Sequence, residues 1–354
     1  MAGLSMLAVT YQGPQQMAVA EHAQPVLAAG DVLITILAAG VCGTDVRVYK
    51  GEHRAAQPGR IPGHEIVGRI EQAAGPLPGG LSVGDAVFVA PNLGCGACRW
   101  CGRGQENLCP ATQALGLTLD GAFAQQMVVP ARAVARGNLI KLAPDADPVA
   151  LVLAEPLACV VRGQGKLGVT AGDVVLVAGG GPVGLLHVAL AKATGAGAIV
   201  CSEPSATRRQ AALRAGATHV IDPTTEDLPG LVRCVSDGRG ADLVVTAAPV
   251  HALQAQALEL AATWGKVLYF GGLPKSRPTV ELDTNLLHYK ELTIAGTTAS
   301  TVEDCRRAAA LIDAGLVDVG WMVSHRFGLA QFDQAIAAAQ NPGALKVVVI
   351  PERN

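Results

Sequence analysis

The first third of the chain alternates short apolar segments with glycine- and proline-rich turns. Between Val32 and Val89, the clearest candidates for strands are residues 32–37, 65–70 and 85–89. These runs are short, apolar and rich in β-branched side chains, as strands usually are. Turn sequences such as Ala74-Gly75-Pro76 separate them. The pattern predicts a small, irregular β-barrel in this part of the chain.

After Gly172 the pattern changes to a regular alternation of strands and helices. The six candidate strands are residues 174–178, 198–201, 219–221, 242–246, 266–270 and 292–295. The first four intervals between them carry helical patterns, at residues 183–194, 206–215, 225–235 and 253–262. Such an alternation predicts a doubly wound parallel sheet, the Rossmann architecture. A further helix is predicted at residues 302–314, with Thr301 as its cap.

The first crossover of this sheet contains a glycine-rich motif. It reads Gly179-Gly180-Gly181-Pro182-Val183-Gly184 and matches G-x-G-x-x-G. In this pattern Gly179 makes the tight turn, Gly181 lets a pyrophosphate approach the backbone, and Gly184 lets helix and strand pack closely. The motif is weak evidence in a chain with 42 glycines. Its place between an apolar strand and a helix, whose N-terminus can hold phosphate, predicts a dinucleotide site.

An acidic residue at the end of the second strand bears on the choice of dinucleotide. Glu203 lies 19 residues past Gly184. A carboxylate there accepts hydrogen bonds from the adenosine ribose hydroxyls and repels a 2′-phosphate, so it predicts NAD rather than NADP. Arg208 and Arg209 are the counter-argument, because a nearby arginine can hold that phosphate. Their alternative interpretation is a solvated helix face.

Four cysteines cluster between the two patterned regions. Cys95, Cys98, Cys101 and Cys109 are separated by two, two and seven residues. Four thiolates so spaced can hold one tetrahedral zinc ion. Two disulfides or an iron–sulfur cluster are the alternatives, but no export signal is evident and ferredoxin-type spacings differ. The spacing predicts a closed, structural zinc site.

A second set of metal-ligand types is spread along the chain. It comprises Cys42, the pair His64-Glu65, and Glu155 in Ala154-Glu155-Pro156. A thiolate, an imidazole and carboxylates are the ligands of a catalytic zinc that keeps one position open. A lone His-Glu pair is more often an exposed turn or a core histidine. Cys42, however, follows a predicted strand and His64 precedes one, and loops at strand ends commonly carry chemistry.

Composition narrows the possible partners and location. The chain has 354 residues, enough for two domains, and a formal net charge of −2 without a basic stripe, which argues against nucleic acid. The longest uncharged apolar run, from Val174 to Ala191, is broken by the glycine loop, so no membrane span is expected. Met1 to Ala8 lacks the pattern of a signal peptide, and the expected location is the cytoplasm.

Together these motifs resemble the zinc-dependent medium-chain dehydrogenase/reductase family over essentially the whole chain. The carboxylate after His64 and the sequence Glu155-Pro156-Leu157-Ala158 are similar to its sorbitol (polyol) dehydrogenase branch and to threonine dehydrogenase. The resemblance implies a GroES-like β-rich catalytic domain of residues 1–155 and 297–354. A Rossmann domain of residues 156–296 is inserted in it. It also implies one catalytic and one structural zinc per chain and a homodimer or homotetramer.

The resemblance also implies roles for individual residues. Cys42, His64 and a carboxylate hold the catalytic zinc, and Glu65 and Glu155 remain the two alternatives for that acid. Asp45 orients His64, and Thr44 takes the proton of the substrate alcohol. The residues implied at the nicotinamide end of NAD are Gly271, Leu273, Thr297 and Thr298, which follow the fifth and sixth strands.

The chain departs from its relatives where they often have a proton-relaying histidine. Arg47 occupies that position, and arginine stays charged at working pH and is a poor base. His53, a chain of waters or the cofactor ribose are the possible substitutes. The predicted relay therefore differs from that of the relatives, whereas the predicted reaction does not.

The leading hypothesis is oxidation of a secondary alcohol of a polyol, sugar or cyclitol to a ketone. The alternative is an L-threonine 3-dehydrogenase or an amino-cyclitol dehydrogenase with the same mechanism. The zinc-free quinone or enoyl reductases are disfavoured by the metal ligands. A binding protein that senses NAD is disfavoured by Cys42, Thr44, His64 and Glu155 being present together.

Overall fold

The structure is a computed structural model that describes residues 5–53 and 57–352. Residues 1–4, part of the segment examined for a signal peptide, lie outside the described residues. The chain divides into two compact units. The first comprises Met1–Ala158, Ala299–Gly315 and Gly320–Asn354, and the second comprises Cys159–Thr298 and Leu316–Val319. No helix among the described residues is long and apolar enough to cross a bilayer.

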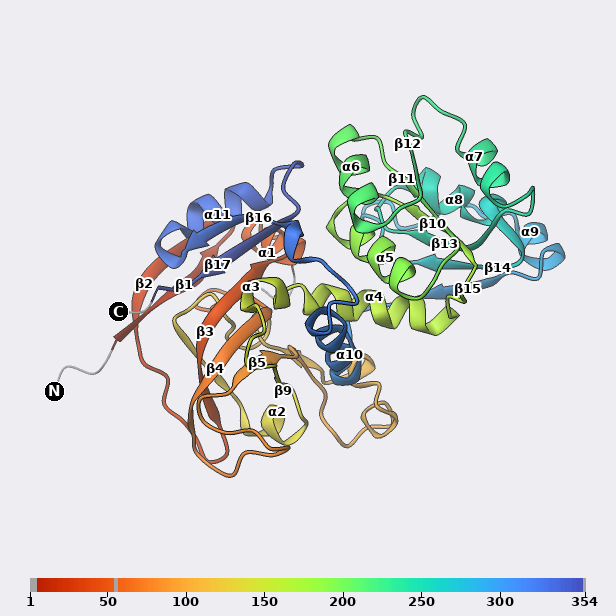
Figure 1. Ribbon diagram of the computed structural model, residues 1–354. Coiled ribbons are helices and arrows are strands. Elements are labelled where there is room, and N and C mark those ends of the chain that lie inside the picture. Colours follow the sequence, from red (N-terminus) through yellow and green to blue (C-terminus); the bar gives the residue numbers. More distant parts are fainter. Residues whose placement is uncertain (1–4, 54–56, 353–354) are drawn as a thin grey trace. The chain divides into compact units, whose positions relative to one another are not determined.

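The first unit is built mainly of β-strands (Figure 1). Its strands are β1 (Ser5–Gly13), β2 (Gln16–Ala23), β3 (Val32–Val41), β4 (Glu65–Ala73), β5 (Ala86–Val89), β6 (Asn92–Leu93), β7 (Gln113–Ala114), β8 (Gln126–Val129), β9 (Leu139–Lys141), β16 (Val323–Gly328) and β17 (Lys346–Ile350). Its helices are α1 (Gly43–Tyr49), α2 (Ala131–Ala135), α3 (Pro148–Leu151), α10 (Val302–Asp313) and α11 (Phe332–Ala339), and α4 (Ala154–Leu167) begins in it.

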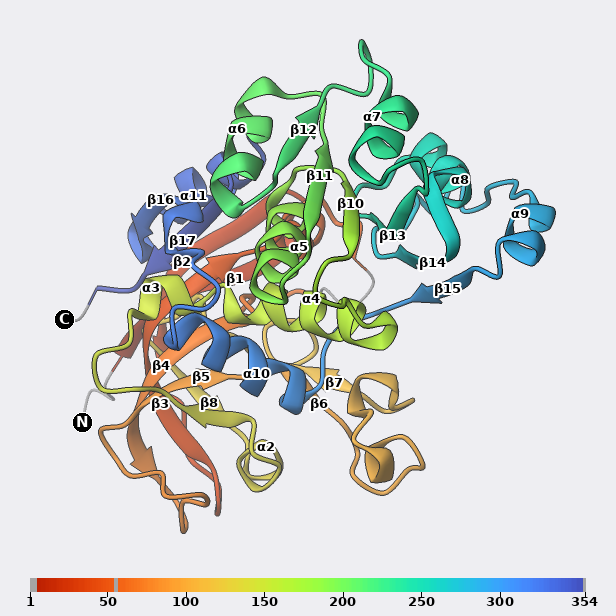
Figure 2. The same cartoon turned by 45° about the vertical axis from the view of Figure 1, so that its right-hand side comes forward.

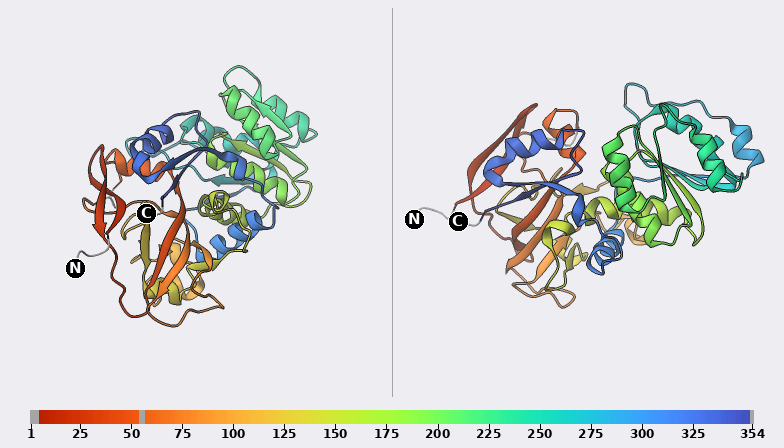
Figure 3. Two further views of the ribbon diagram at one scale, coloured as in Figure 1. Left: turned by 60° about the vertical axis from the view of Figure 1, so that its left-hand side comes forward. Right: turned by 45° about the horizontal axis from the view of Figure 1, so that its top comes forward.

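The main sheet of this unit joins both ends of the chain. Its strand order is β16-β17-β3-β4-β5-β9, and β8 also pairs with β3. Helix α11 packs on β16 and β17, as Figure 3 shows. The ring of Phe332 on this helix lies 4.8 Å from the ring of Phe123, both side chains being buried. The C-terminal segment therefore completes the same hydrophobic core as the N-terminal strands.

The second unit is the predicted doubly wound sheet. Its strands are β10 (Val174–Ala178), β11 (Ala198–Ser202), β12 (His219–Ile221), β13 (Ala241–Thr246), β14 (Ala261–Tyr269) and β15 (Thr293–Gly296), in the order β12-β11-β10-β13-β14-β15 and all parallel. Its helices are α5 (Pro182–Ala193), α6 (Ala206–Ala215), α7 (Leu228–Val235), α8 (His251–Leu260) and α9 (Thr284–Tyr289). Because crossovers are right-handed and the order reverses at β10, α5 and α6 cover one face and α7 and α8 the other (Figure 2).

Two element boundaries in this unit differ from the predictions. The helix predicted at residues 253–262 ends at Leu260, because Ala261 already pairs with Ala241 of β13. The strand then bulges at Trp264, whose φ is +60°, before it rejoins the predicted run. Ladder pairing with β13 thus overrides the helical preference of the alanines. The helix predicted at residues 225–235 begins at Leu228, because the side chain of Asp227 caps it.

Most other predicted elements are confirmed, including the cap of α10. The hydroxyl of Thr301 accepts from the N–H of Asp304, and the Asp304 carboxylate accepts from the N–H of Thr301. Helix α9 was not predicted. It is a short helix that begins after Asp283, whose carboxylate accepts from the N–H of Asn285.

Candidate active site and metal centres

The pairing of β3 brings distant parts of the first unit to one end of the sheet. This strand runs antiparallel to both β4 and β17, with Gly40 opposite Glu65 on one side and Val348 on the other. The end of β3 therefore lies beside the beginnings of β4 and β17. Cys42 comes directly after β3, Glu65 is the first residue of β4, and Lys346 is the first residue of β17.

Three predicted metal ligands converge at this place. One ligand atom each from Cys42, His64 and Glu65 lie within 4.8 Å of one another. His64 and Glu65 are buried, and Oε1 of Glu65 has no hydrogen-bond partner among the described residues although it is shielded from water. A buried, unpaired carboxylate oxygen is costly unless a cation is nearby. A thiolate, an imidazole and a carboxylate in this arrangement fit zinc.

Asp45 ties two of these ligands together. It is the third residue of α1, and its Oδ2 accepts a hydrogen bond of 2.8 Å from the backbone N–H of Cys42. Its Oδ1 lies 3.5 Å from Nδ1 of His64. Burial lowers the pKa of His64, but Asp45 and Cys42 together raise it well above the ordinary value. Asp45 faces Nδ1, so Nε2 is the ring nitrogen left for a metal.

Glu155 lies in the first turn of α4 and is buried close to this group. Its pKa is raised to about 7, chiefly by burial, with contributions from the neighbouring charges of Glu65 and Asp45. His64 and Lys346 act in the opposite direction. Glu155 is not one of the three residues whose ligand atoms lie within 4.8 Å. The structure therefore places Glu65 with Cys42 and His64, and Glu155 beside them.

Lys346 belongs to this group but was missed by the sequence analysis. Its ammonium forms an ion pair with Oε2 of Glu65 and donates to the carbonyl of Val41 at 3.3 Å. The only signal in the sequence is a lysine that opens the apolar run Val347-Val348-Val349-Ile350. A lysine at a strand end is usually exposed, so this signal did not distinguish it.

The predicted proton-transfer residue lies at the start of α1. Oγ1 of Thr44 accepts a hydrogen bond of 3.1 Å from Nη2 of Arg47, one turn further along the helix. The departure noted in the sequence is thus in direct contact with Thr44. His53 follows α1 in the loop that leads to residues 54–56, which lie outside the described residues.

The four clustered cysteines also come together as predicted. Ligand atoms of Cys95, Cys98, Cys101 and Cys109 lie within 4.8 Å of one another, and none of them forms a disulfide. The backbone N–H groups of Ala97 and Cys98 lower the pKa of Cys95 to about 6. Four cysteines grouped around a stabilised thiolate fit a structural zinc.

The segment that carries the four cysteines, residues 92–109 (the cysteine lobe), is hydrogen-bonded to the start of α10. Oε1 of Glu106 accepts a hydrogen bond of 2.6 Å from the N–H of Val302. The side chain of Asn92 donates to the carbonyl of Ser300 at 3.1 Å. Together these bonds link the cysteine lobe to the segment where the chain re-enters the first unit.

In the second unit, the glycine loop has the geometry that the motif requires. Gly179 has a φ of +114°, and a Cβ at Gly184 would overlap the carbonyl oxygen of Gly179. Apart from its chain neighbours and the backbone of its own helix, no atom of the described residues lies within 4 Å of the position a Cβ would take at Gly181, which caps α5. The N-terminus of α5, at Pro182 and Val183, thus follows open space suited to phosphate.

Glu203 binds the backbone of the glycine loop through its carboxylate. Its Oε2 accepts from the N–H of Gly180 at 2.8 Å, and its Oε1 accepts from the N–H of Ser205 at 3.0 Å. The guanidinium of Arg209 donates to two backbone carbonyls, those of Glu203 and Pro204, and to Asp222. Arg209 thus bonds to groups that directly follow β11 and β12. Arg208 lies in the first turn of α6.

The other predicted cofactor residues lie at the same edge of the sheet. Gly271 and Leu273 follow β14, and Thr297 and Thr298 follow β15. A Cβ at Gly271 would come 3.1 Å from the backbone of Ala248, and one at Gly179 would come 2.9 Å from the Cβ of Ala248. The loops after β10, β13 and β14 therefore pack together at their carboxyl ends, where doubly wound sheets bind ligands.

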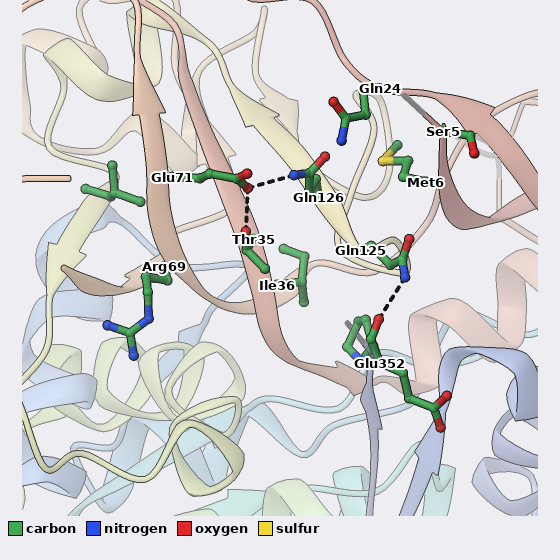
Figure 4. Close-up of a pocket in the computed structure, with 12 residues that line it drawn as sticks. Ser5, Met6, Gln24, Thr35, Ile36, Arg69, Glu71, Gln125, Gln126 and Glu352 are labelled. Atoms are coloured by element: carbon green, nitrogen blue, oxygen red, sulfur yellow. Dashed lines mark hydrogen bonds between the residues drawn. The ribbon is translucent and has the colours of Figure 1, made fainter. Parts of the chain in front are cut away.

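A cavity of about 490 Å³ in the first unit contains none of the predicted site residues (Figure 4). Its most prominent acid, Glu71, already accepts hydrogen bonds from Thr35 at 2.5 Å and from Gln126 at 2.7 Å. The side chain of Gln125 donates to the carbonyl of Glu352. Figure 4 shows these three hydrogen bonds, and the lining contains none of the predicted metal ligands, so this cavity is a poor candidate for the active site.

Comparison with known proteins agrees with this geometry. The model of the alcohol dehydrogenase GroES-like domain matches residues 28–139, and that of the zinc-binding dehydrogenase matches residues 182–314. The L-threonine 3-dehydrogenase of Pyrococcus furiosus is 35% identical over 325 residues, which are 90% of either chain. The chain belongs to the zinc-dependent medium-chain dehydrogenase/reductase family. It is therefore an oxidoreductase of a family that uses zinc and a nicotinamide dinucleotide.

Other members of the family are similar over the full length. The sorbitol dehydrogenase of Halalkalibacterium halodurans is 29% identical and covers 98% of this chain and 99% of its own. A protein of Sinorhizobium meliloti, described as a zinc-binding dehydrogenase and solved with NADP, is 32% identical with a TM-score of 0.90. It covers 98% of this chain and 100% of its own. An alcohol dehydrogenase of Thermus sp. ATN1 is 29% identical with a TM-score of 0.89, over 98% of this chain and 100% of its own.

Proposed function

We propose that this protein oxidises a secondary alcohol to a ketone, with NAD as the hydride acceptor and a zinc ion bound by Cys42, His64 and Glu65. The observation that carries the proposal is the convergence of these three ligand types within 4.8 Å. The sequence left Glu65 and Glu155 as alternatives, and the grouping of the ligand atoms supports Glu65. Glu155 then remains as a neighbouring acid.

Zinc at these three residues would supply Lewis acidity to an alcohol oxygen. The chain's own side chains do the rest. Asp45 holds the backbone of Cys42 and faces Nδ1 of His64, which orients the ring. Thr44 accepts the alcohol proton at Oγ1. The guanidinium of Arg47 holds that hydroxyl but cannot take the proton onward, so the proton leaves by another route. His53 is the nearby candidate in sequence.

The second zinc is assigned to Cys95, Cys98, Cys101 and Cys109, whose role is to hold the loop. We assign dinucleotide binding to Gly179, Gly181, Pro182, Val183 and Gly184, and the ribose contact to Glu203. The remaining cofactor contacts are assigned to Arg208, Gly271, Leu273, Thr297 and Thr298. Residues 1–155 with 297–354 would form the catalytic domain, and residues 156–296 the NAD-binding domain.

The buried carboxylate of Glu203 favours NAD in this proposal. It occupies the end of β11 and already orders the glycine loop through Gly180. A 2′-phosphate would meet this negative charge, and Arg209 is held by Asp222 and by backbone carbonyls. The Sinorhizobium meliloti relative was solved with NADP, and binding titrations with both dinucleotides test which of them this chain prefers.

For the substrate, the relatives suggest a common chemistry. L-threonine and sorbitol both carry a polar group, amino or hydroxyl, on the carbon next to a secondary alcohol. We propose a substrate of this class. L-threonine is the first substrate to test, because the L-threonine 3-dehydrogenase of Pyrococcus furiosus is 35% identical to this chain, whereas the sorbitol dehydrogenase is 29% identical.

The test is a panel of L-threonine, sorbitol, a cyclitol and 2-propanol, with NADH absorbance followed for the parent and for His64→Asn. We expect turnover of at least one substrate with an adjacent polar group, little with 2-propanol, and none for the variant. A zinc-loaded parent that oxidises none of the four, or a fully active His64→Asn, would refute the proposal.

A further inference from the structure

A buried lysine next to a proposed metal ligand requires an explanation. Lys346 is 5% exposed and Glu65 is fully buried, and their charged groups are in contact. Burying a charge is unfavourable unless it is paired and hydrogen-bonded. Here the ammonium has two partners, Oε2 of Glu65 and the carbonyl of Val41.

Gly40 provides the space for this pair. It lies within β3, with Glu65 and Val348 as its neighbours on the two adjoining strands. A Cβ at this position would overlap the carboxylate of Glu65 and would come 2.9 Å from Cε of Lys346. Any side chain at Gly40 would therefore displace the ion pair. The close contact of Lys346 with Glu65 is thus built into three adjacent strands.

Apart from the imidazole of His64, the groups around Lys346 are negative or potentially negative. Glu65, Cys42 and Glu155 all act to hold Lys346 in its charged form, and Asp45 acts on Glu155 nearby. When zinc is absent, Lys346 is the cation in direct contact with the carboxylate of Glu65, and the imidazole of His64 lies beside that carboxylate. When zinc is present, the lysine and the metal both draw on the same carboxylate and repel each other.

We propose that Lys346 is a positioning residue that replaces the charge of the metal in the zinc-free site and weakens the hold of Glu65 on zinc in the loaded site. This inference rests on the proposed zinc ligands. In the free site the ammonium holds the carboxylate of Glu65 in place, so the pocket does not have to rearrange before a metal binds. In the loaded site the ammonium of Lys346 would partly neutralise the carboxylate of Glu65. The attraction between that carboxylate and zinc would then be weaker.

Loss of the charge of Lys346 should affect the zinc-free and the zinc-loaded protein differently. Lys346→Met removes the cation but keeps an apolar chain of similar length. In the zinc-free protein, the buried Glu65 would then lose its ion-pair partner, which is destabilising. In the zinc-loaded protein, the metal still compensates Glu65 and is no longer repelled. We therefore expect the substitution to destabilise the zinc-free form more than the loaded form.

The experiment measures the Tm of the zinc-free and zinc-loaded full chain for the parent, Lys346→Met and Lys346→Arg. Lys141→Met is the matched control, since Lys141 pairs with Asp85 at 2.7 Å but is half exposed. Zinc should raise the Tm of Lys346→Met by more than it raises that of the parent. Lys346→Arg should behave like the parent, and Lys141→Met should shift both forms equally.

A chelator competition provides the second readout and starts from loaded protein, so it does not require the zinc-free variant to fold. Each chain is proposed to hold two zinc ions. The zinc that the parent holds and Cys42→Ser lacks is the one bound next to Lys346. We expect Lys346→Met to hold this zinc about tenfold more tightly, as when a like charge a few ångströms away is removed. Equal Tm shifts in both forms, or looser zinc in Lys346→Met, would overturn the inference. If Cys42→Ser loses no zinc relative to the parent, the proposed ligand set is wrong instead.

Discussion

Arg47 donates a hydrogen bond from Nη2 to Oγ1 of Thr44, at 3.1 Å. The residue that takes the place of a histidine relay therefore contacts the hydroxyl proposed to receive the alcohol proton. Arginine can orient that hydroxyl but cannot accept its proton, because its pKa is too high. Oγ1 of Thr44 has to serve both the guanidinium and the substrate.

We expect Thr44→Val to lower kcat by about 10²-fold, the low end of the contribution of a positioned proton-transfer group. Thr44→Ser is the control and should retain most of the activity, because it keeps the hydroxyl. Zinc content, measured on each protein, should not change. Turnover of Thr44→Val at the parental rate would show that the proton leaves by a route without Thr44, and His53 would then be tested.

Arg47→His should introduce a group that titrates near neutral pH in place of one that does not. We expect turnover to persist and the profile of log kcat against pH to gain an inflection near 6.5, the ordinary pKa of histidine. The profile of the parent should lack this feature. Identical profiles for the two proteins would mean that the side chain at this position does not relay the proton.

Glu203 should decide between the two dinucleotides. Its carboxylate accepts from Gly180 and is placed to meet the ribose, so we expect Glu203→Ala to weaken NAD⁺ binding by about tenfold or more. Glu203→Gln keeps the size of the side chain and removes the charge, so it should specifically improve NADP⁺. Binding titrations with both cofactors test this. Equal affinity of the parent for NAD⁺ and NADP⁺ would contradict the assignment.

The two metal centres should differ in lability. Four thiolates fill every position of a structural zinc site, whereas the catalytic site keeps one position open. Mild chelation should therefore abolish activity and leave about one zinc per chain. Cys98→Ser should lower the Tm, and Cys42→Ser should lower activity with a smaller effect on the Tm. Metal analysis and thermal melts check both, and simultaneous loss of both zincs would argue against two distinct sites.

A buried histidine in the second unit should make the protein sensitive to acid. Nδ1 of His187 lies 3.1 Å from the amide nitrogen of Gln164, which also donates to the carbonyl of His187 at 2.9 Å. Its ring meets Phe270 edge-on at 4.6 Å. The amide donates to both atoms, so Nδ1 is an acceptor and the ring is neutral. Burial lowers the pKa of His187 to about 3.

The unfolded chain binds a proton at this residue below about 6.5, whereas the folded chain does not until about pH 3. The stability that depends on neutral His187 is therefore present above pH 6.5 and is lost as the pH falls towards 3. The loss should reach on the order of 5 kcal/mol. Denaturant unfolding of His187→Gln should depend less steeply on pH across this window, while the exposed control His219→Gln should follow the parent. Parallel curves for parent and His187→Gln would refute this.

Short stretches of neighbouring residues were sufficient to predict most strands and helices and several candidate site residues of this protein. The glycine loop, the four cysteines and the alternation of strands and helices are patterns of neighbouring residues, and their geometry follows from short-range sterics and spacing. The same holds for Cys42 and His64, because each adjoins a strand that its own apolar pattern predicts. Asp45 was expected only through the resemblance to the family, because the helix α1 that carries it was not predicted.

Only the tertiary structure decided the features that depend on strands from different parts of the chain. Lys346 donates to Val41 across 305 residues, and no local pattern distinguishes it from an exposed lysine. Gly40 looks like an ordinary strand glycine until Glu65 and Lys346 are placed beside it. The grouping of Glu65, rather than Glu155, with Cys42 and His64 and the early start of β14 at Ala261 have the same origin. Burial and pairing between strands set these outcomes, and both depend on which strands become neighbours in the folded chain.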